Sequence, residues 1–330
     1  MLVGSLDVRN GCGVHYNYAR FAAAYLKSVT SHWAKSSTRV QTIFMSNVDT
    51  QRQIVTAKNG RTIQATIFRP QGEVKAAVLI VAAMGVSQGY YAKFASWLAE
   101  QGYAVATFDY SGTGASRVGD PRRVDGDILD WARFDCDAMV DATACIAPGR
   151  PLYWIGHSLG GQILGFVPDL HRIAKMITVA TGSGYWLENS WALRWRVWFF
   201  WFVFAPLLIR KYGYFPGKRF RVVGDLPRGV IQQWRRWCLD PEYAVGAEGA
   251  SAREKFASVT LPITAISFTD DEMMSERNTA SLHAFYSGAP RVMKRIAPRD
   301  IGVARIGHFG FFSARFKEAL WRNVLLPELS

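Results

Sequence analysis

From about residue 50 onward, short apolar runs alternate with segments whose apolar residues recur at helical spacing. Residues 53–58 and 61–68 flank Asn59-Gly60 and predict a β-hairpin. Further strands are predicted at 76–82, 104–108, 152–155, 175–180, 262–267 and 292–296. Helices are predicted at 88–101, 125–146, 159–167, 276–286 and 312–325. This order of elements predicts an α/β fold with a mostly parallel, twisted sheet covered by helices on both faces.

The alternation stops between residues 185 and 258, where Trp, Phe and Arg are frequent and no clear strand is apparent. We therefore expect a helical cap at 185–258, inserted into a core formed by 45–184 and 259–330. Residues 1–44 carry no chemical motif, so we treat them as an N-terminal extension, with Met45 as an alternative start.

The longest apolar run, 13 residues from Val197 to Ile209, lies within the cap. Its flanking basic residues are Arg194, Arg196, Arg210 and Lys211. Two interpretations remain open: a buried cap helix, which we favour, or an interfacial helix that touches lipid over 195–209. If the run is a buried cap helix, Pro206 is expected to break it. No run is long enough to predict a membrane-spanning helix.

The 330-residue chain has 39 Lys and Arg against 26 Asp and Glu, a net charge of +13. The cap has 12 basic and 6 acidic residues, and segment 1–44 has five and one, so most of the excess lies outside the core. We expect no nucleic-acid partner, because no binding motif or long basic run accompanies this charge. The N-terminus lacks a signal-peptide pattern and the four cysteines form no CxxC pair. We therefore expect a cytoplasmic protein with reduced thiols and no metal site.

The most informative stretch is LYWIGHSLGG at 152–161, where a predicted strand passes through Gly156-x-Ser158-x-Gly160 into a predicted helix. A serine on such a sharp turn has a strained backbone, and side chains two residues before or after it would clash. The turn lifts the hydroxyl above the sheet. Because the strand and the helix are predicted independently of the motif, we favour Ser158 as a nucleophile over a solvated serine in a glycine-rich turn.

A serine hydroxyl needs a base, and the base needs an orienting carboxylate; in this topology they follow in the order serine, acid, histidine. Only His283 and His308 follow the cap, and His283 reads as a surface residue of the predicted helix 276–286. We therefore predict His308, in the loop before the last helix, as the base. Asp271 is the preferred acid and Asp270 the alternative; the other one is expected to face water or cap the next helix.

The developing oxyanion needs two backbone N–H donors. We expect one from Leu159, directly after the nucleophile, and one from Met84, in the turn after the strand at 76–82. The simpler interpretation of Met84 is that its side chain only lines a pocket.

These motifs resemble the α/β-hydrolase superfamily, in a branch similar to serine aminopeptidases and monoacylglycerol lipases. The resemblance rests on GHSLGG (156–161), DDEMMS (270–275), GHFGFF (307–312) and a D-x-x-G-x-G-x-S loop at 109–116. The cap stretches 213–220 and 225–238 look like a largely uncharacterised bacterial group, and the resemblance covers about 50–330. Two positions depart from it: Ala83-Met84 stands where many relatives have His-Gly, and Phe268 where relatives often have Gly.

The resemblance implies a serine hydrolase without a cofactor, acting on a small-molecule ester or acyl substrate. An aromatic cap suits acyl chains, which favours an ester over a peptide. The cap tryptophans are Trp186, Trp191, Trp195, Trp198, Trp201, Trp234 and Trp237. For most of these rings, packing of the cap onto the core is the simpler interpretation. Peptide hydrolysis, acyl transfer and ligand binding without catalysis are the alternatives.

Overall fold

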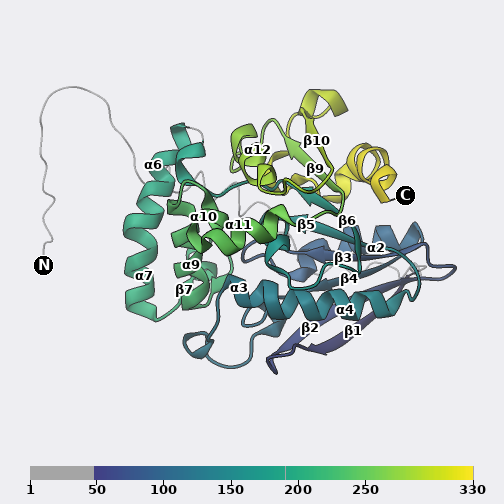
Figure 1. Ribbon diagram of the computed structural model, residues 1–330, viewed down its shortest axis with the longest axis horizontal. Helices are drawn as coiled ribbons and strands as arrows, with labels where there is room; N and C mark the ends of the chain where they lie inside the picture. Colours follow the sequence, from purple (N-terminus) through teal and green to yellow (C-terminus); the bar gives the residue numbers. More distant parts are fainter. Residues whose placement is uncertain (1–47, 190, 330) are drawn as a thin grey trace, which may run out of the picture. The chain divides into compact units, whose positions relative to one another are not determined.

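The computed structural model, which describes residues 48–189 and 191–329, contains an eight-stranded sheet in the order β1-β2-β4-β3-β5-β6-β9-β10 (Figure 1). Its strands are β1 (Val48–Thr56), β2 (Thr62–Pro70), β3 (Ala76–Val81), β4 (Tyr103–Phe108), β5 (Leu152–His157), β6 (Ile173–Val179), β9 (Ile263–Phe268) and β10 (Arg291–Ile296). β1 and β2 pair antiparallel around the turn at Asn59-Gly60, as predicted. β2 is also antiparallel to β4, and the strands from β4 to β10 are parallel to one another.

Helices lie on both sides of this sheet (Figure 1), so the predicted fold class is confirmed. The core helices are α2 (Ala92–Glu100), α3 (Ile128–Asp130), α4 (Asp137–Ile146), α5 (Leu159–Gln162), α12 (Glu276–Ala284) and α13 (Gly307–Gly310), with π-helical segments at Trp131–Cys136 and Lys317–Leu325. β3, β4 and β5 are buried along their whole length, which explains their uninterrupted apolar sequences.

The helix predicted at 159–167 is shorter than expected. α5 ends at Gln162, and a separate 3₁₀ turn follows at Leu164–Phe166. Close packing explains the difference, because a Cβ at Gly165 would collide with the Phe256 ring. This tight contact requires glycine, and glycine weakens a helix.

Between β6 and β9 the chain forms the segment that we call the cap. Its helices are α6 (Trp191–Phe199), α7 (Ala205–Tyr212), α8 (Gly217–Phe220), α9 (Arg228–Leu239), α10 (Tyr243–Glu248) and α11 (Ala250–Ala257). The expectation that this segment contains no strand was wrong in one detail. Two-residue strands β7 (Phe215–Pro216) and β8 (Asp225–Leu226) pair antiparallel and close the loop that carries α8.

Pro206 does not break its helix, contrary to expectation. α6, a π-helical turn at Phe200–Phe204 and α7 follow one another without a gap, so the helix runs from Trp191 to Tyr212. The proline lies in the first turn of α7, directly after the π turn. A π turn shifts the hydrogen-bond register, which accommodates a residue that has no N–H to donate.

No helix among the described residues is long and apolar enough to cross a membrane. The expectations for the extension 1–44 and for Met45 lie outside the described residues.

Candidate active site

Ser158 lies on a sharp turn between β5 and α5. Its backbone is left-handed, with φ 50° and ψ −111°, a conformation that costs a non-glycine residue on the order of 1–3 kcal/mol. The glycines of the motif have the expected steric role. A Cβ at Gly156 would collide with the backbone of Gly160, and a Cβ at Gly160 would collide with the carbonyl of Val81. The strained turn therefore requires both glycines and packs against the end of β3.

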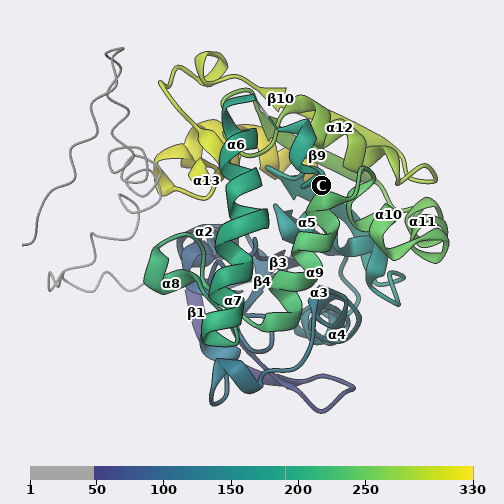
Figure 2. The same ribbon diagram turned by 90° about the vertical axis from the view of Figure 1, so that its left-hand side faces the viewer.

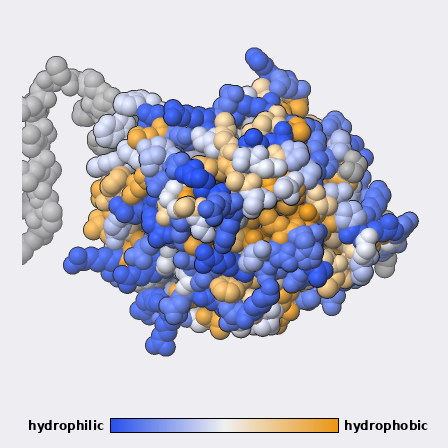
Figure 3. All heavy atoms as spheres, viewed as in Figure 1, coloured by the Kyte–Doolittle hydropathy of each residue, from blue (hydrophilic) through white to orange (hydrophobic). Residues whose placement is uncertain are grey.

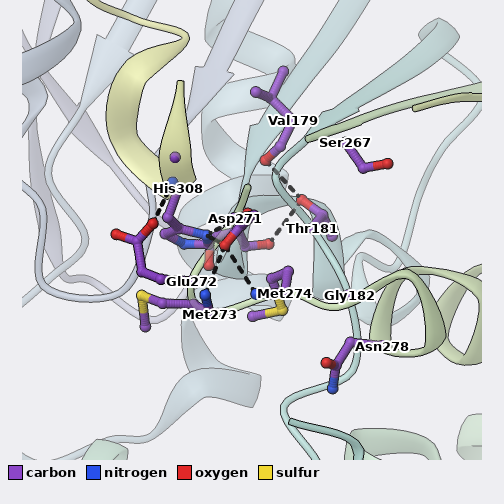
Figure 4. A network of polar contacts seen from close by, with 12 residues as sticks. Val179, Thr181, Gly182, Ser267, Asp271, Glu272, Met273, Met274, Asn278 and His308 are labelled. Atoms are coloured by element: carbon purple, nitrogen blue, oxygen red, sulfur yellow. Dashed lines mark hydrogen bonds and ion pairs between the residues drawn. The ribbon is translucent and has the colours of Figure 1, made fainter. Parts of the chain in front are cut away.

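His308, in α13, lies next to Asp271, in the loop after β9. His308 Nδ1 is 2.9 Å from Asp271 Oδ2 and 3.1 Å from Oδ1, and both side chains are almost completely buried (Figure 4). Asp271 Oδ1 also accepts hydrogen bonds from the backbone N–H groups of Met273 and Met274, at 2.8 and 2.9 Å. The carboxylate is therefore fixed by its own loop while it contacts the imidazole.

The two neighbours of Asp271 hold the backbone of the same histidine loop. Asp270 Oδ2 accepts hydrogen bonds from the N–H groups of Ile306 and Gly307, at 2.8 and 3.1 Å. Glu272 Oε2 accepts one from the His308 N–H, at 3.2 Å. We had expected Asp270 to face water or to cap the helix that follows it. Instead, its carboxylate binds the loop 36 residues further along the chain.

Burial lowers the pKa of His308, but the charge and hydrogen bond of Asp271, together with the charge of Glu272, outweigh this effect and raise the pKa above 6.5. Such an imidazole accepts a proton more readily than an isolated buried one. This is the property that a general base requires.

A chain of buried hydrogen bonds joins the three segments that carry the candidate residues. The Ala83 N–H donates to Tyr91 Oη at 2.9 Å, and Tyr91 Oη lies 2.9 Å from His157 Nδ1. His157 Nε2 lies 3.2 Å from the carbonyl oxygen of His308. Burial, followed by the charge of His308, holds the pKa of His157 well below 6.5, so the imidazole is neutral. We infer that Tyr91 donates to Nδ1 and that Nε2–H donates to the carbonyl.

The two expected oxyanion donors lie in neighbouring turns. Met84 follows β3, and Leu159 begins α5, which contacts the end of β3 through Gly160. Within the described part of the chain, neither the Met84 N–H nor the Leu159 N–H forms a hydrogen bond. Both donors are therefore available to a ligand.

A loop of the cap contacts the turn after β3. The Gly224 N–H donates to the carbonyl of Gly85 at 3.1 Å, and a Cβ on either glycine would collide with the other's backbone. The cap therefore holds the turn that carries Met84.

The cap tryptophans differ in their exposure. Trp201 and Trp237 are buried and Trp186 and Trp234 are half-buried, whereas Trp191, Trp195 and Trp198 are exposed. Trp201 packs edge-on against Trp234 with ring centroids 5.0 Å apart, and Trp237 stacks on Phe166. Part of the set therefore packs the cap, as the simpler interpretation held, and part faces outward.

Sequence reasoning missed the roles of Tyr91, His157, Glu272 and Gly224. Glu272 and His157 adjoin motif residues, and this proximity was the only available signal. The prediction that His283 lies on the surface was wrong, because its side chain is buried. His283 Nε2 lies 2.9 Å from Thr178 Oγ1, and burial lowers the pKa of His283 to about 4.

Comparison with known proteins agrees with this architecture. The family model described as serine aminopeptidase, S33 matches residues 72–214. A comparison with curated protein sequences finds no match. Similar solved structures include a soluble variant of monoglyceride lipase from Saccharomyces cerevisiae, at 17% identity and a TM-score of 0.55, covering 79% of this chain and 90% of that one.

Two further structures are similar to a comparable degree. One is a thermostable carboxyl esterase from Bacillus coagulans, at 16% identity and a TM-score of 0.53, covering 75% of this chain and 90% of that one. The other is a membrane phospholipase A described as a bacterial virulence factor, at 14% identity and a TM-score of 0.52, covering 94% and 92%. The sheet order and these neighbours show that the chain has the α/β-hydrolase fold, and the family match over residues 72–214 is consistent with it.

Proposed function

We propose that the chain is a serine hydrolase that cleaves carboxylic esters, with Ser158 as nucleophile, His308 as general base and Asp271 as orienting acid. The observation that carries the proposal is the buried Asp271–His308 pair beside the left-handed serine turn. The His157 side chain, directly before Ser158, bonds to the His308 backbone and so fixes one segment against the other.

The proposed reaction has two steps. Ser158 Oγ attacks the ester carbonyl and passes its proton to His308 Nε2, while the N–H groups of Met84 and Leu159 bind the oxyanion. The C–O bond to the alcohol breaks, and the alcohol takes the proton from His308. Water then attacks the acyl-enzyme, its proton again passing to His308, and the acid leaves as Ser158 regains its proton.

Charge favours esters over the peptides of an aminopeptidase. An aminopeptidase binds the ammonium group of its substrate, which calls for an acidic partner. The part of the cap from 189 to 224, which ends at the contact with Gly85, has no acidic residue. It has seven basic residues: Arg194, Arg196, Arg210, Lys211, Lys218, Arg219 and Arg221. This positive field disfavours a substrate that carries an ammonium group.

Amide hydrolysis is the second candidate function, because the matched family is described as serine aminopeptidase. Acyl transfer would use the same three residues. A panel of acyl esters of increasing chain length and amino-acid amides, with product analysis in the presence of an acceptor alcohol, separates these reactions. Faster cleavage of amides than of esters contradicts the ester preference.

Covalent labelling tests the nucleophile and separates an enzyme from a hydrolase-like binding protein. A fluorophosphonate should label the wild-type chain and the exposed control Ser258→Ala, but not Ser158→Ala. Labelling that persists in Ser158→Ala, with a normal melting temperature, would overturn the assignment.

A further inference from the structure

One face of the helix from Trp191 to Tyr212 carries a row of exposed aromatic rings. Positions 191, 195, 198 and 202 recur every three or four residues and so share a face. The exposed fractions are 71% for Trp191, 64% for Trp195, 40% for Trp198, 52% for Phe199 and 42% for Phe202. We call these five residues the aromatic ridge. Exposed rings in this number are unusual, because large aromatic side chains are normally buried.

The opposite face of the same helix is packed into the cap. Trp201, Ala205 and Leu208 are buried, and Arg235 of α9 donates to the Trp201 carbonyl at 2.7 Å. Figures 1 and 2 place α6 and α7 at the outer edge of the cap. The helix is thus anchored on one side, and the ridge is presented outward.

The rings of the ridge also hold one another. Trp195 and Trp198 are edge to face with centroids 6.3 Å apart, and Trp198 stacks on Phe202 at 5.8 Å. The Arg194 guanidinium lies 5.9 Å from the centroid of the Trp191 ring. The ridge is therefore an ordered surface, which loses little side-chain entropy when it docks.

Basic side chains accompany the ridge. Arg196 is exposed between the rings, and Arg210 and Lys211 are exposed at the other end of the helix. Figure 3 shows both hydrophilic and hydrophobic residues along this edge. With no acidic residue between 189 and 224, this surface is complementary to an anionic partner.

We propose that the aromatic ridge docks on an anionic lipid bilayer, with the helix lying in the interface and the basic residues meeting the lipid headgroups. Tryptophan and arginine suit this boundary, because each combines an apolar body with a polar tip. Segment 1–44 has five basic residues and one acidic residue, and a second copy of the chain is also basic. Like charge therefore disfavours both as occupants of this surface.

Vesicle sedimentation with the full chain tests the proposal. The wild-type protein should sediment with vesicles of phosphatidylcholine and phosphatidylglycerol, and more weakly with phosphatidylcholine alone. Trp195→Ala/Trp198→Ala should weaken binding on the order of tenfold or more. Arg210→Gln/Lys211→Gln should weaken it about fivefold for each charge removed.

Two matched controls carry equivalent changes elsewhere. Val292→Ala/Met293→Ala shortens a pair of side chains that are 52% and 48% exposed on β10, and Arg299→Gln/Lys255→Gln removes two charges from other exposed positions. Both controls should bind like the wild type. Equal losses in the controls, or binding that survives the ridge substitutions, overturns the proposal.

Binding is independent of the proposed chemistry, so the two can fail separately. Ser158→Ala should sediment like the wild type, and the ridge variants should cleave a water-soluble short ester at the wild-type rate. A wild-type chain that stays in the supernatant overturns the proposal. In that case, a dimer that Trp195→Ala/Trp198→Ala converts to a monomer identifies a second copy as the occupant.

Discussion

At the scale of single residues, the three carboxylates after β9 divide the support of His308 among them. Asp271 contacts the imidazole. Asp270 accepts hydrogen bonds from the N–H groups of the two residues that precede His308, and Glu272 accepts one from the N–H of His308 itself. All three act on one loop, but only Asp271 reaches the ring that would carry the proton.

Substituting Asp271 should change both the rate and its dependence on pH. The pKa of His308 is raised above 6.5. Wild-type kcat/KM should therefore rise as pH increases through this raised pKa, because the imidazole becomes neutral and can act as a base. Asp271→Asn removes the charge that raises this pKa, so the acid limb should move to lower pH. Loss of the orienting carboxylate should lower kcat by about 10³–10⁴-fold.

Asp270→Asn is the matched control, since it makes the same chemical change one residue away. It should lower kcat less and leave the acid limb in place, as measured by kcat/KM from pH 5 to 9. If the acid limb moved only in Asp270→Asn, Asp270 rather than Asp271 would be the orienting acid.

Removing the Tyr91 hydroxyl should impair catalysis more than stability. Tyr91→Phe deprives both the Ala83 N–H and His157 Nδ1 of their buried partner, next to the turn that carries Met84. Displacement of that turn should lower kcat by about 10- to 100-fold with little change in KM. Steady-state kinetics and melting temperatures check this.

Tyr103→Phe is the control for Tyr91→Phe, because it also removes a buried tyrosine hydroxyl, which donates a hydrogen bond to the Leu329 carbonyl. It should lower the melting temperature to a similar extent and leave kcat unchanged. Equal kcat in the two variants contradicts a positioning role for Tyr91.

At the scale of elements, the core strands could be predicted because burial on both faces produces apolar runs. The π turn before Pro206, the short α5 and the two-residue strands β7 and β8 could not, because they depend on tertiary contacts. The same division holds at the site. The G-x-S-x-G motif indicated Ser158, and chain order indicated His308 and the acidic pair. The partners of Tyr91 could not be predicted, because they depend on how distant segments pack.

The substitution Gly224→Ala, which adds one methyl group, tests the contact between the cap loop and the turn after β3. In Gly224→Ala the new Cβ meets the Gly85 carbonyl, so the two backbones must move apart. We expect kcat to fall on the order of tenfold or more, because the Met84 N–H moves with that turn. Gly72→Ala, where a Cβ has open space, should leave kcat unchanged. Unchanged kcat in Gly224→Ala would show that the cap does not position the turn.

At the scale of the whole molecule, Glu328 ties the C-terminal turn to three strands. Its carboxylate forms ion pairs with Lys175 of β6 and Lys294 of β10, and accepts a hydrogen bond from Thr264 of β9 at 2.7 Å. Burial alone would raise its pKa, but these hydrogen bonds lower it to about 2. The last residues of the chain therefore stabilise one half of the sheet.

Glu328→Gln should lower the melting temperature by about 3–6 °C at neutral pH. Because the folded-state pKa lies below the ordinary 4.5, the contribution is present above 4.5 and is lost as pH falls toward 2. The difference from the wild type should therefore shrink on acidification. Glu318→Gln, at an exposed pair with Arg322, should change the melting temperature by less than about 1 °C. Equal shifts in the two variants would contradict this role.

The pairing of β6 with β9 has a consequence for how the cap can vary. The chain leaves the sheet after Val179 and returns to the adjacent strand, and the Ala180 N–H donates to the Ile266 carbonyl at 2.9 Å. The ends of the insertion therefore stay together whatever lies between them. The entropy of closing such a loop grows only logarithmically, so doubling its length costs about 0.6 kcal/mol. A longer or shorter insertion should therefore cost the sheet little stability.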